Sequence, residues 1–545
     1  MKFQLNYVCL ALAAMTGSAE ALTLTNVSDA NPKTLGFSAP NIVSAELDLR
    51  LLATGSMKLD GATTATLPGI PFSTQYYGYI NNGTTSTMLP ILGSAATPSP
   101  AIEASKTEPD KNTYLELEGQ HGALPDYNYG KHFLFQGHEV GAHGYITRIN
   151  LDADGAHRVT LLADTLADGS IIPNIDGSTW DPFATKLLFT GEEAATTGVT
   201  EGVVLEASAD YPSTVTKLDT VIGHAGWEGI QVDSVGNLWL VADQGGLTGS
   251  VNTKAKQPNS FVYRFVPKDN TDLALGGKLQ ALQVQSLAHA GPIIFNAGQA
   301  DTDILSTDVK DLHTYGKMFR TAWVTVHDTN TDGFGVFDAN LAAKAANATP
   351  FKRPENGVFR PSSENPFKQF FFTETGDTNN LTQAGSVYGG FGAVFTVSQS
   401  SPSANTGSLK MLYLGDATHS GFDNIAFLTK DQLLVVEDAG DTLHTQRNAL
   451  DSGYLFDVKK DYSVANNLPV RFLAEGRDAS ATLDSAASGL SPNQDNEITG
   501  IHVSNGDASV YGLLGSQNPT PFKEGWRVFW TQQHGDNNTW EIVPK

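Results

Sequence analysis

A short apolar strand that runs directly into acidic or histidine residues recurs along this chain. If the copies belong to sheets arranged around one axis, their polar ends converge at one place. Converging carboxylates repel one another unless a cation binds between them, so the repeat predicts a fold and a metal site together. The copies are HFLFQGHE (132–139), LLFTGEE (187–193), LWLVAD (238–243), AWVTVHD (322–328), FFFTETGD (370–377), LLVVEDAGD (433–441) and VFWTQQHGD (528–536).

The composition agrees with a large all-β protein. The chain has 545 residues, of which 40% are hydrophobic and 9% aromatic, so it can bury a sizeable core. Short strands separated by turns rich in Gly, Asp, Asn and Pro favour β-propeller blades over helical architectures. The chain has 34 basic and 58 acidic residues, a net charge of −24. This balance disfavours binding to nucleic acid or an anionic membrane and favours hard cations such as calcium.

The N-terminus has the pattern of a signal peptide over residues 1–21. Lys2 supplies the positive start, residues 7–14 are apolar, and Ala19-Glu20-Ala21 fits a cleavage site. We therefore expect a periplasmic or secreted protein with no membrane span, and we expect a monomer. Cys9 is the only cysteine and leaves with the signal peptide, so the mature chain has no thiolate to offer a metal.

Three regions are expected along the chain: the signal peptide, an N-terminal strand and loop region over 22–112, and a β-propeller domain over 113–545. Residues 92–112 have the composition of a linker or a long surface loop. Seven strand copies fit six or seven blades, because one copy can be a closing strand or an insertion.

Further carboxylates lie beside these strands in a fixed order. One glutamate next to a strand is usually a solvated turn residue, but the ordered set is more specific. The segments are Gly191-Glu192-Glu193, Trp227-Glu228, Arg353-Pro354-Glu355, Phe422-Asp423-Asn424, Glu497-Ile498-Thr499-Gly500 and Gln533-His534.

With these segments, residues 131–540 resemble the PhoX-type alkaline phosphatases, a family of exported, metal-dependent β-propeller phosphohydrolases. The resemblance implies a six-bladed propeller with iron and calcium ions on its axis, which hold the phosphate and activate the attacking oxygen. It implies that Arg353 clamps the phosphoryl oxygens, that Glu355 is catalytic as well as a ligand, and that His534 contacts substrate. The metal ligands that it implies are Glu192, Glu228, Glu355, Glu497 and Asp423.

The sequence departs from the family pattern at two places. The family's cysteine, an iron ligand, is replaced by Gly191, and the family's lysine has no counterpart at the compared positions Val326 and His327. Without a soft donor, the site favours calcium or another hard cation over iron.

Three functions remain open from the sequence. The first is a calcium-dependent phosphatase that hydrolyses small phosphomonoesters. The second is another calcium-dependent hydrolase on the same scaffold, acting on a lactone or a phosphodiester. The third is a catalytically silent calcium-binding propeller used for binding, because a fold does not fix a reaction.

Overall fold

The structure, a computed structural model, describes most of the chain after residue 21. The described residues are 22–35, 39–63, 73–81, 105–139, 144–191, 202–250, 252–253, 255–362, 366–379, 382–476, 497–533 and 537–545. The expected signal peptide over residues 1–21 lies outside them. Strands dominate throughout, which confirms the all-β prediction. Among the described residues, no helix is long and apolar enough to span a membrane.

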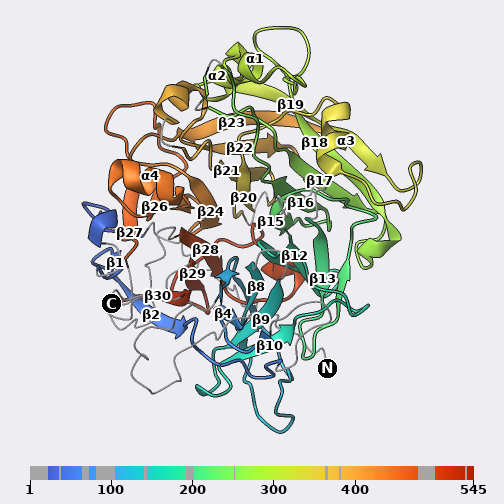
Figure 1. Cartoon of the computed structure of the whole chain (residues 1–545), viewed down its shortest axis with the longest axis vertical. Helices are drawn as coiled ribbons and strands as arrows, with labels where there is room; N and C mark the ends of the chain where they lie inside the picture. The colour runs from blue at the N-terminus through green and yellow to red at the C-terminus, as the bar shows by residue number, and fades with distance from the viewer. Residues whose placement is uncertain are drawn as a thin grey trace, which may run out of the picture.

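Four-stranded antiparallel units repeat along the chain, and we call each unit a blade (Figure 1). The strands of a blade pair mostly in chain order, from an inner strand to an outer one. Blade 1 contains β6 (Glu108–Pro109) and β7 (Thr113–Glu116), which both pair with β8 (His132–Glu139), then β9 (Tyr145–Asn150) and β10 (Val159–Ala163). Blade 2 contains β11 (Ser178–Asp181), β12 (Lys186–Thr190), β13 (Val204–Ala207) and β14 (Val215–Lys217). Blade 3 contains β15 (Trp227–Val232), β16 (Leu238–Ala242), β17 (Val262–Pro267) and β18 (Gly277–Val284).

The second half of the chain repeats the same unit three more times. Blade 4 contains β20 (Pro354–Phe359), β21 (Gln369–Glu374), β22 (Ala393–Gln399) and β23 (Thr406–Leu414). Blade 5 contains β24 (Phe422–Phe427), β25 (Gln432–Glu437), β26 (Ser452–Asp457) and β27 (Val470–Ala474). Blade 6 contains β28 (Glu497–Ser504), β29 (Arg527–Gln533) and β30 (Asn538–Pro544), and its outer strand is β2 (Leu47–Ala53).

The inner strands form a closed ring within the described part of the chain. Strand β7 contacts β11, and contacts continue in order through β15, β20, β24 and β28, which touches β7 again. This closure confirms the propeller prediction, and the ring protects the short inner edges of the blades.

Most strands that end in an acid occupy the same position in their blades. Six of the seven sequence copies are the second strands of blades, namely β8, β12, β16, β21, β25 and β29. The seventh copy lies in β19 (Met318–Asp328), which pairs with β18 and with β23 and so joins blades 3 and 4 into one nine-stranded sheet. Val326 and His327 therefore lie in a strand at the outer edge of two blades and not near the axis.

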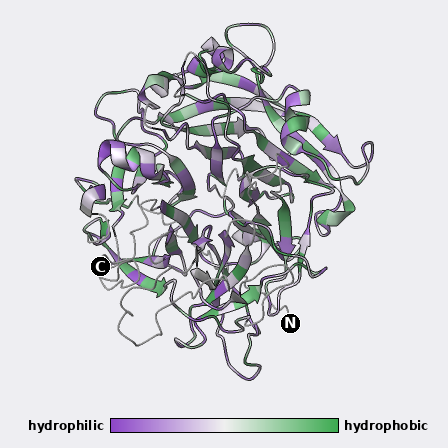
Figure 2. Ribbon diagram, viewed as in Figure 1, coloured by the Kyte–Doolittle hydropathy of each residue, from purple (hydrophilic) through white to green (hydrophobic). Residues whose placement is uncertain are grey.

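The hydrophobic core lies between successive blades. Most strands of the inner and second positions are buried along their whole length, because each packs between neighbours on both faces. Trp227 of β15 and Trp239 of β16 are 0% and 1% exposed in the largest cluster, which extends from blade 2 to blade 4. Figure 2 shows hydrophobic colour concentrated along the strands. This packing is the reason that apolar runs, and not alternating patterns, mark the strands in the sequence.

The N-terminal region takes part in the propeller. Strand β2 completes blade 6, and β1 (Ile42–Val43) pairs with β27 of blade 5, so the expected boundary at residues 112 and 113 does not separate these strands from the propeller. A small sheet contains β3 (Ser73–Thr74), β4 (Tyr79–Asn81) and β5 (Ser105–Lys106). The helices are short: α1 (Ala300–Ile304), α2 (Thr307–Leu312), α3 (Ala339–Ala345), α4 (Gly440–Arg447), η1 (Lys33–Leu35), η2 (Leu273–Leu275), η3 (Thr382–Tyr388) and η5 (Val510–Gly512).

Candidate functional site

Antiparallel pairing gathers the acidic residues at one end of the propeller. An inner strand starts where the second strand of its blade ends, as the pairs Trp227 with Ala242, Pro354 with Glu374, and Phe422 with Glu437 show. Residues at the start of inner strands and at the end of second strands therefore share one face, which we call the acidic end. The sequence predicted that polar strand ends converge on one side of a ring, and the described strand ends confirm it.

A shared irregularity distinguishes the inner strands at the acidic end. The register shifts between Trp227 and Ile230 in β15, and the same shift follows Pro354 in β20, Phe422 in β24 and Thr499 in β28. A bulge bends the strand and turns a side chain away from its regular direction. The carboxylates Glu228, Glu355 and Asp423 lie inside these shifted segments, so the irregularity repeats at the residues that the sequence selected.

The first carboxylate cluster contains Glu228, Asp243 and Glu355. One oxygen from each side chain lies within 4.8 Å of the others. Arg353 binds this cluster, because its Nε donates to both Asp243 oxygens at 3.0 and 2.9 Å and its Nη2 donates to Asp243 Oδ2 at 2.7 Å. Arg353 Nη2 also lies 3.5 Å from Glu355 Oε1, which receives no hydrogen bond from a described residue.

The electrostatics of this cluster follow from burial and charge. Burial raises the pKa of Glu355 well above its usual value, and the Asp243 carboxylate raises it further. Burial alone would lower the pKa of Arg353, but Asp243 and Glu355 hold it well above its usual value. Three carboxylates thus share one guanidinium, so the described side chains of this cluster carry excess negative charge.

Two lysines, Lys352 and Lys256, lie near Arg353. Lys352 is buried and donates to both oxygens of Asp377 at 3.0 Å. Lys256 is half-buried, and its pKa is lowered by burial and by the nearby positive charge of Arg353. Lys352 and Lys256, which the sequence analysis did not select as site residues, therefore lie near Arg353, which it did select.

The second carboxylate cluster contains Asp110, Glu139 and Asp176. One oxygen from each again lies within 4.8 Å of the others. Asp110 accepts from Thr499 Oγ1 and, at 3.2 Å, from Gln533 Nε2. Asp110 and Asp176 were not predicted as site residues, since Asp110 lay in a segment interpreted as a linker.

A buried lysine lies beside Asp423 at the acidic end. Lys111 Nζ donates to Asn424 Oδ1 at 2.9 Å, and Asn424 Nδ2 donates to Asp423 Oδ2 at 2.7 Å. Burial lowers the pKa of Lys111 to about 8. Burial together with the Asp110 carboxylate raises the pKa of Asp423 to about 7. Lys111 comes from the segment 92–112, which the sequence analysis interpreted as a linker or surface loop.

Glu497 lies at the start of β28, at the same end of the propeller. Burial raises its pKa well above the usual value, and the carboxylates of Asp438 and Asp423 raise it further. Five of the seven predicted site residues thus lie at the acidic end. Glu228, Glu355 and Asp423 are buried acids, Glu497 is a partly buried acid, and Arg353 binds this group. Glu192 and His534 lie outside the described residues.

Gly191, which replaces the family's cysteine, has little room for a side chain. A Cβ atom at this position would lie 2.6 Å from the carbonyl oxygen of Asn174 and 3.2 Å from that of Val203. Both obstacles are backbone atoms, which cannot move aside as a flexible side chain does. The local backbone is therefore shaped around a glycine.

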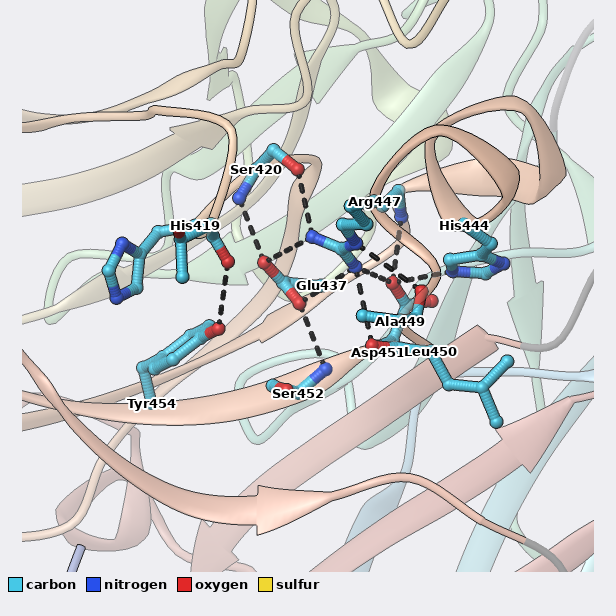
Figure 3. A network of polar contacts seen from close by, with 12 residues as sticks. His419, Ser420, Glu437, His444, Arg447, Ala449, Leu450, Asp451, Ser452 and Tyr454 are labelled. Carbon is cyan, nitrogen blue, oxygen red and sulfur yellow. Dashed lines mark hydrogen bonds and ion pairs between the residues drawn. The ribbon is translucent and has the colours of Figure 1, made fainter. Parts of the chain in front are cut away.

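Two acid-ended strands do not serve the clusters. Glu374 accepts from the backbone N–H of Lys352 and lies 2.8 Å from His313 Nε2. Glu437 accepts from the backbone N–H groups of Ser420 and Ser452, at 2.8 and 2.9 Å, and binds Arg447 (Figure 3). Both side chains are 0% exposed. Their neighbours already satisfy them, so these two acids are structural.

Comparison with known proteins supports the same family as the sequence motifs. The description "Alkaline phosphatase PhoX" matches residues 252–519, a span that includes Arg353, Glu355, Asp423 and Glu497. The structure of Pseudomonas fluorescens PhoX in complex with vanadate, a transition state analogue, covers 96% of this chain and 98% of its own. Its TM-score is 0.51 and its sequence identity is 12%, so this likeness shows a shared fold.

Other matches are more distant. The structure of Chaetomium thermophilum Sqt1 covers 91% of this chain and 98% of its own, with 9% identity and a TM-score of 0.35. No curated protein sequence matches the chain significantly.

Proposed function

We propose that this chain is a PhoX-type alkaline phosphatase that hydrolyses phosphomonoesters with a divalent cation at the acidic end of the propeller, and the match of residues 252–519 to that family supports the proposal. The observation that carries the proposal is the joint position of Arg353 and the cluster of Glu228, Asp243 and Glu355. A planar guanidinium beside a cation site is the arrangement that phosphoryl transfer needs, because the transferred group carries charge on several oxygens.

The donor set fits calcium. Two oxygens that share one calcium ion at 2.3–2.6 Å lie no more than about 5 Å apart. Each of the two clusters meets that limit with three carboxylates, and all the donors are oxygens. Burial and the Asp243 carboxylate raise the pKa of Glu355, and a cation in the first cluster would offset the second of these effects. Iron is the less favoured metal, since no thiolate is present in the mature chain.

We assign separate roles to the protein groups and to the ion. Glu228, Asp243 and Glu355 would hold one cation, and Asp110, Glu139 and Asp176 would hold another. A bound cation would neutralise charge on the phosphoryl oxygens. Arg353 is 22% exposed, so its guanidinium can donate hydrogen bonds to those oxygens while Asp243 orients it. Glu192, Glu497 and His534 remain proposed site residues, the first and second as ligands and the third as a substrate contact.

Hydrolysis of a chromogenic phosphomonoester tests the proposal. We expect turnover with calcium, loss of turnover in chelator, and little additional activity on adding iron. Vanadate should inhibit, as its complex with the Pseudomonas fluorescens protein suggests. Activity on a phosphodiester or a lactone instead would identify a different hydrolase. Calcium binding without any hydrolysis would identify a binding protein.

We also propose that the protein is exported through its N-terminal signal peptide and acts as a monomer. Sequencing of the exported protein should find Leu22 as the first residue, and light scattering should give the mass of one chain. A cell-associated protein that keeps residues 1–21 would contradict the export proposal.

A further inference from the structure

A pocket lies at the end of the propeller opposite the two carboxylate clusters. Arg360 follows the last residue of β20, whereas Glu355 lies near its first. Five residues of strand separate them, which is about 17 Å at 3.3 Å per residue. Asp431 lies in the turn between β24 and β25, and Lys459 follows β26. The pocket therefore lies between the turns of blades 4 and 5, away from the acidic end.

Positive charge dominates the described lining of this pocket. Arg360, Lys368, Lys430 and Lys459 line it, and Asp431 is the one acidic residue among the described lining residues. Asp431 binds both Arg360 and Lys459, so a single carboxylate serves two cations. These side chains leave a net charge of +3 in a protein whose net charge is −24. The pocket is thus positively charged although the whole chain is acidic, and positive charge in a pocket attracts anions.

The arginine of the pocket is held by several hydrogen bonds, while Lys459 remains largely exposed. Arg360 Nε donates to the carbonyl oxygen of Lys430 at 2.9 Å, and its Nη1 donates to Gln369 Oε1 at 2.8 Å. These bonds fix the guanidinium as part of the wall. Lys459 keeps 62% of its side chain exposed, so its ammonium can reach a ligand. Lysine binds phosphate as a mobile point charge.

The size and the polar lining of the pocket indicate what kind of anion it takes. Its volume is about 620 Å³, within the range of about 300–1,000 Å³ that small-molecule sites occupy and far larger than a bare phosphate needs. Ser398 Oγ accepts from Gln369 Nε2 at 3.3 Å, so its hydroxyl proton remains able to donate to a ligand. Asn518 also lines the pocket. The pocket can therefore hold a ligand that has a polar organic portion next to its anionic group.

We propose that this pocket binds a phosphorylated, hydroxyl-rich small molecule, with its phosphate among Lys368, Lys430 and Lys459. The pocket contains no carboxylate cluster able to hold a metal among its described lining residues. We therefore assign it the role of a binding site. The inference does not depend on the proposed phosphatase activity, because it uses none of the residues of the acidic end.

Calorimetric titration with the phosphonate analogue of glucose 6-phosphate tests the proposal, because its P–C bond resists hydrolysis. The wild-type protein should bind it saturably, and Lys430→Glu combined with Lys459→Glu should weaken the affinity at least about tenfold. Lys217→Glu, an exposed lysine in β14 of blade 2, is the matched control and should bind as wild type does. Asp431→Asn should bind more tightly, since it removes the one acidic group.

Parallel titrations with inorganic phosphate and with glucose distinguish the sources of the ligand. Equal affinity for phosphate and phosphonate assigns the site to the free anion, and tighter binding of the phosphonate assigns it to an organic phosphate. Phosphatase activity should be unchanged in the double lysine variant. The proposal is overturned if wild type does not bind either anion, if the double variant binds as well as Lys217→Glu, or if Arg353→Ala alone abolishes binding.

Discussion

Two arginines of this protein each bind a pair of carboxylates, and their surroundings differ. Arg447 binds Glu437 and Asp451, both 0% exposed, at 3.1 and 3.0 Å. Each oxygen of Glu437 also accepts a backbone N–H (Figure 3). Arg353 binds Asp243 and Glu355, but Glu228 adds a third carboxylate to this group. No described residue donates a hydrogen bond to Glu355 Oε1.

The difference separates a structural charge group from a binding one. Around Arg447, two carboxylates face two basic side chains, Arg447 and His444, and Asp451 Oδ2 is the acceptor of the pair that receives no hydrogen bond from a described residue. Around Arg353, the protein leaves excess negative charge and an unfilled acceptor at the propeller axis. An acid at the end of a strand is therefore informative only together with the groups that surround it.

The largest effect that we expect concerns stability at Arg447. Arg447→Ala leaves Glu437 and Asp451 buried without their cation, and breaking a buried pair in this way costs about 3–5 kcal/mol. Urea unfolding should show this loss with calcium present and with chelator alike. Arg50→Ala is the control, because Arg50 is 62% exposed and should contribute little. A variant as stable as the control would mean that the Arg447 group is not the structural one.

Arg353→Ala should instead affect catalysis. We expect phosphatase activity to fall about tenfold to a thousandfold, the range for one lost transition-state donor. In calcium the variant should stay folded, because the cation still balances the carboxylates. In chelator it should lose more stability than wild type does, because the carboxylates then have no counter-charge. Activity equal to wild type would place the site elsewhere in the molecule.

Calcium removal should distinguish the two groups directly. Binding to the native state alone stabilises by about 2.7 kcal/mol at a hundredfold excess over Kd. Wild type should lose this increment of stability in chelator, and Glu355→Gln should show a smaller increment. Arg447→Ala should retain the full increment, since its group binds no ion. An unchanged melting curve of wild type in excess chelator would argue against a bound cation.

Gly191→Cys should destabilise the protein and not restore an iron site. The Cβ must displace the carbonyl oxygens of Asn174 and Val203, and overpacking of this kind costs about 1–3 kcal/mol. Melting temperature and elemental analysis of the purified variant check this expectation. Normal stability with bound iron would mean that the backbone adapts and that the position still supports a thiolate ligand.

The fold was predictable because one feature of the sequence repeats. Second strands are buried on both faces and end at the acidic end, so each appears as an apolar run followed by an acid. The copy in β19 is the exception, since this strand joins two blades and ends at the partly buried Asp328, away from the acidic end. Pairing of β2 with β30 was not predictable, because the partners are far apart in sequence and no local pattern indicates closure.

The candidate site was only partly predictable, for a related reason. Glu228, Glu355 and Asp423 follow the start of inner strands, a pattern that local sequence and family resemblance reveal together. Asp110 and Lys111 come from a segment rich in loop-forming residues, and only the ring of inner strands brings them next to Asp423. Glu374 and Glu437 share the strand-end pattern, but their partners Lys352 and Arg447 are recognisable only in three dimensions.

The smallest effect that we expect is a pH dependence confined to the Arg447 group. His444 Nε2 lies 2.9 Å from Asp451 Oδ1. Burial would lower the pKa of His444, but the Asp451 carboxylate raises it above the usual value, with Arg447 opposing and Glu475 supporting that effect. Protonated His444 therefore stabilises the native state, fully so below its unfolded pKa of about 6.5, and this contribution disappears as pH rises through the higher folded pKa.

His444→Gln tests this expectation, because glutamine keeps a donor but carries no charge. The stability difference between wild type and variant should be largest near pH 5–6 and should decrease toward pH 9, by about 1.4 kcal/mol for each pH unit that separates the folded and unfolded pKa of His444. Calcium should leave this difference unchanged, since the ion is bound elsewhere. A difference that is independent of pH would mean that His444 is neutral in the folded protein, and one that depends on calcium would couple the two arginine groups.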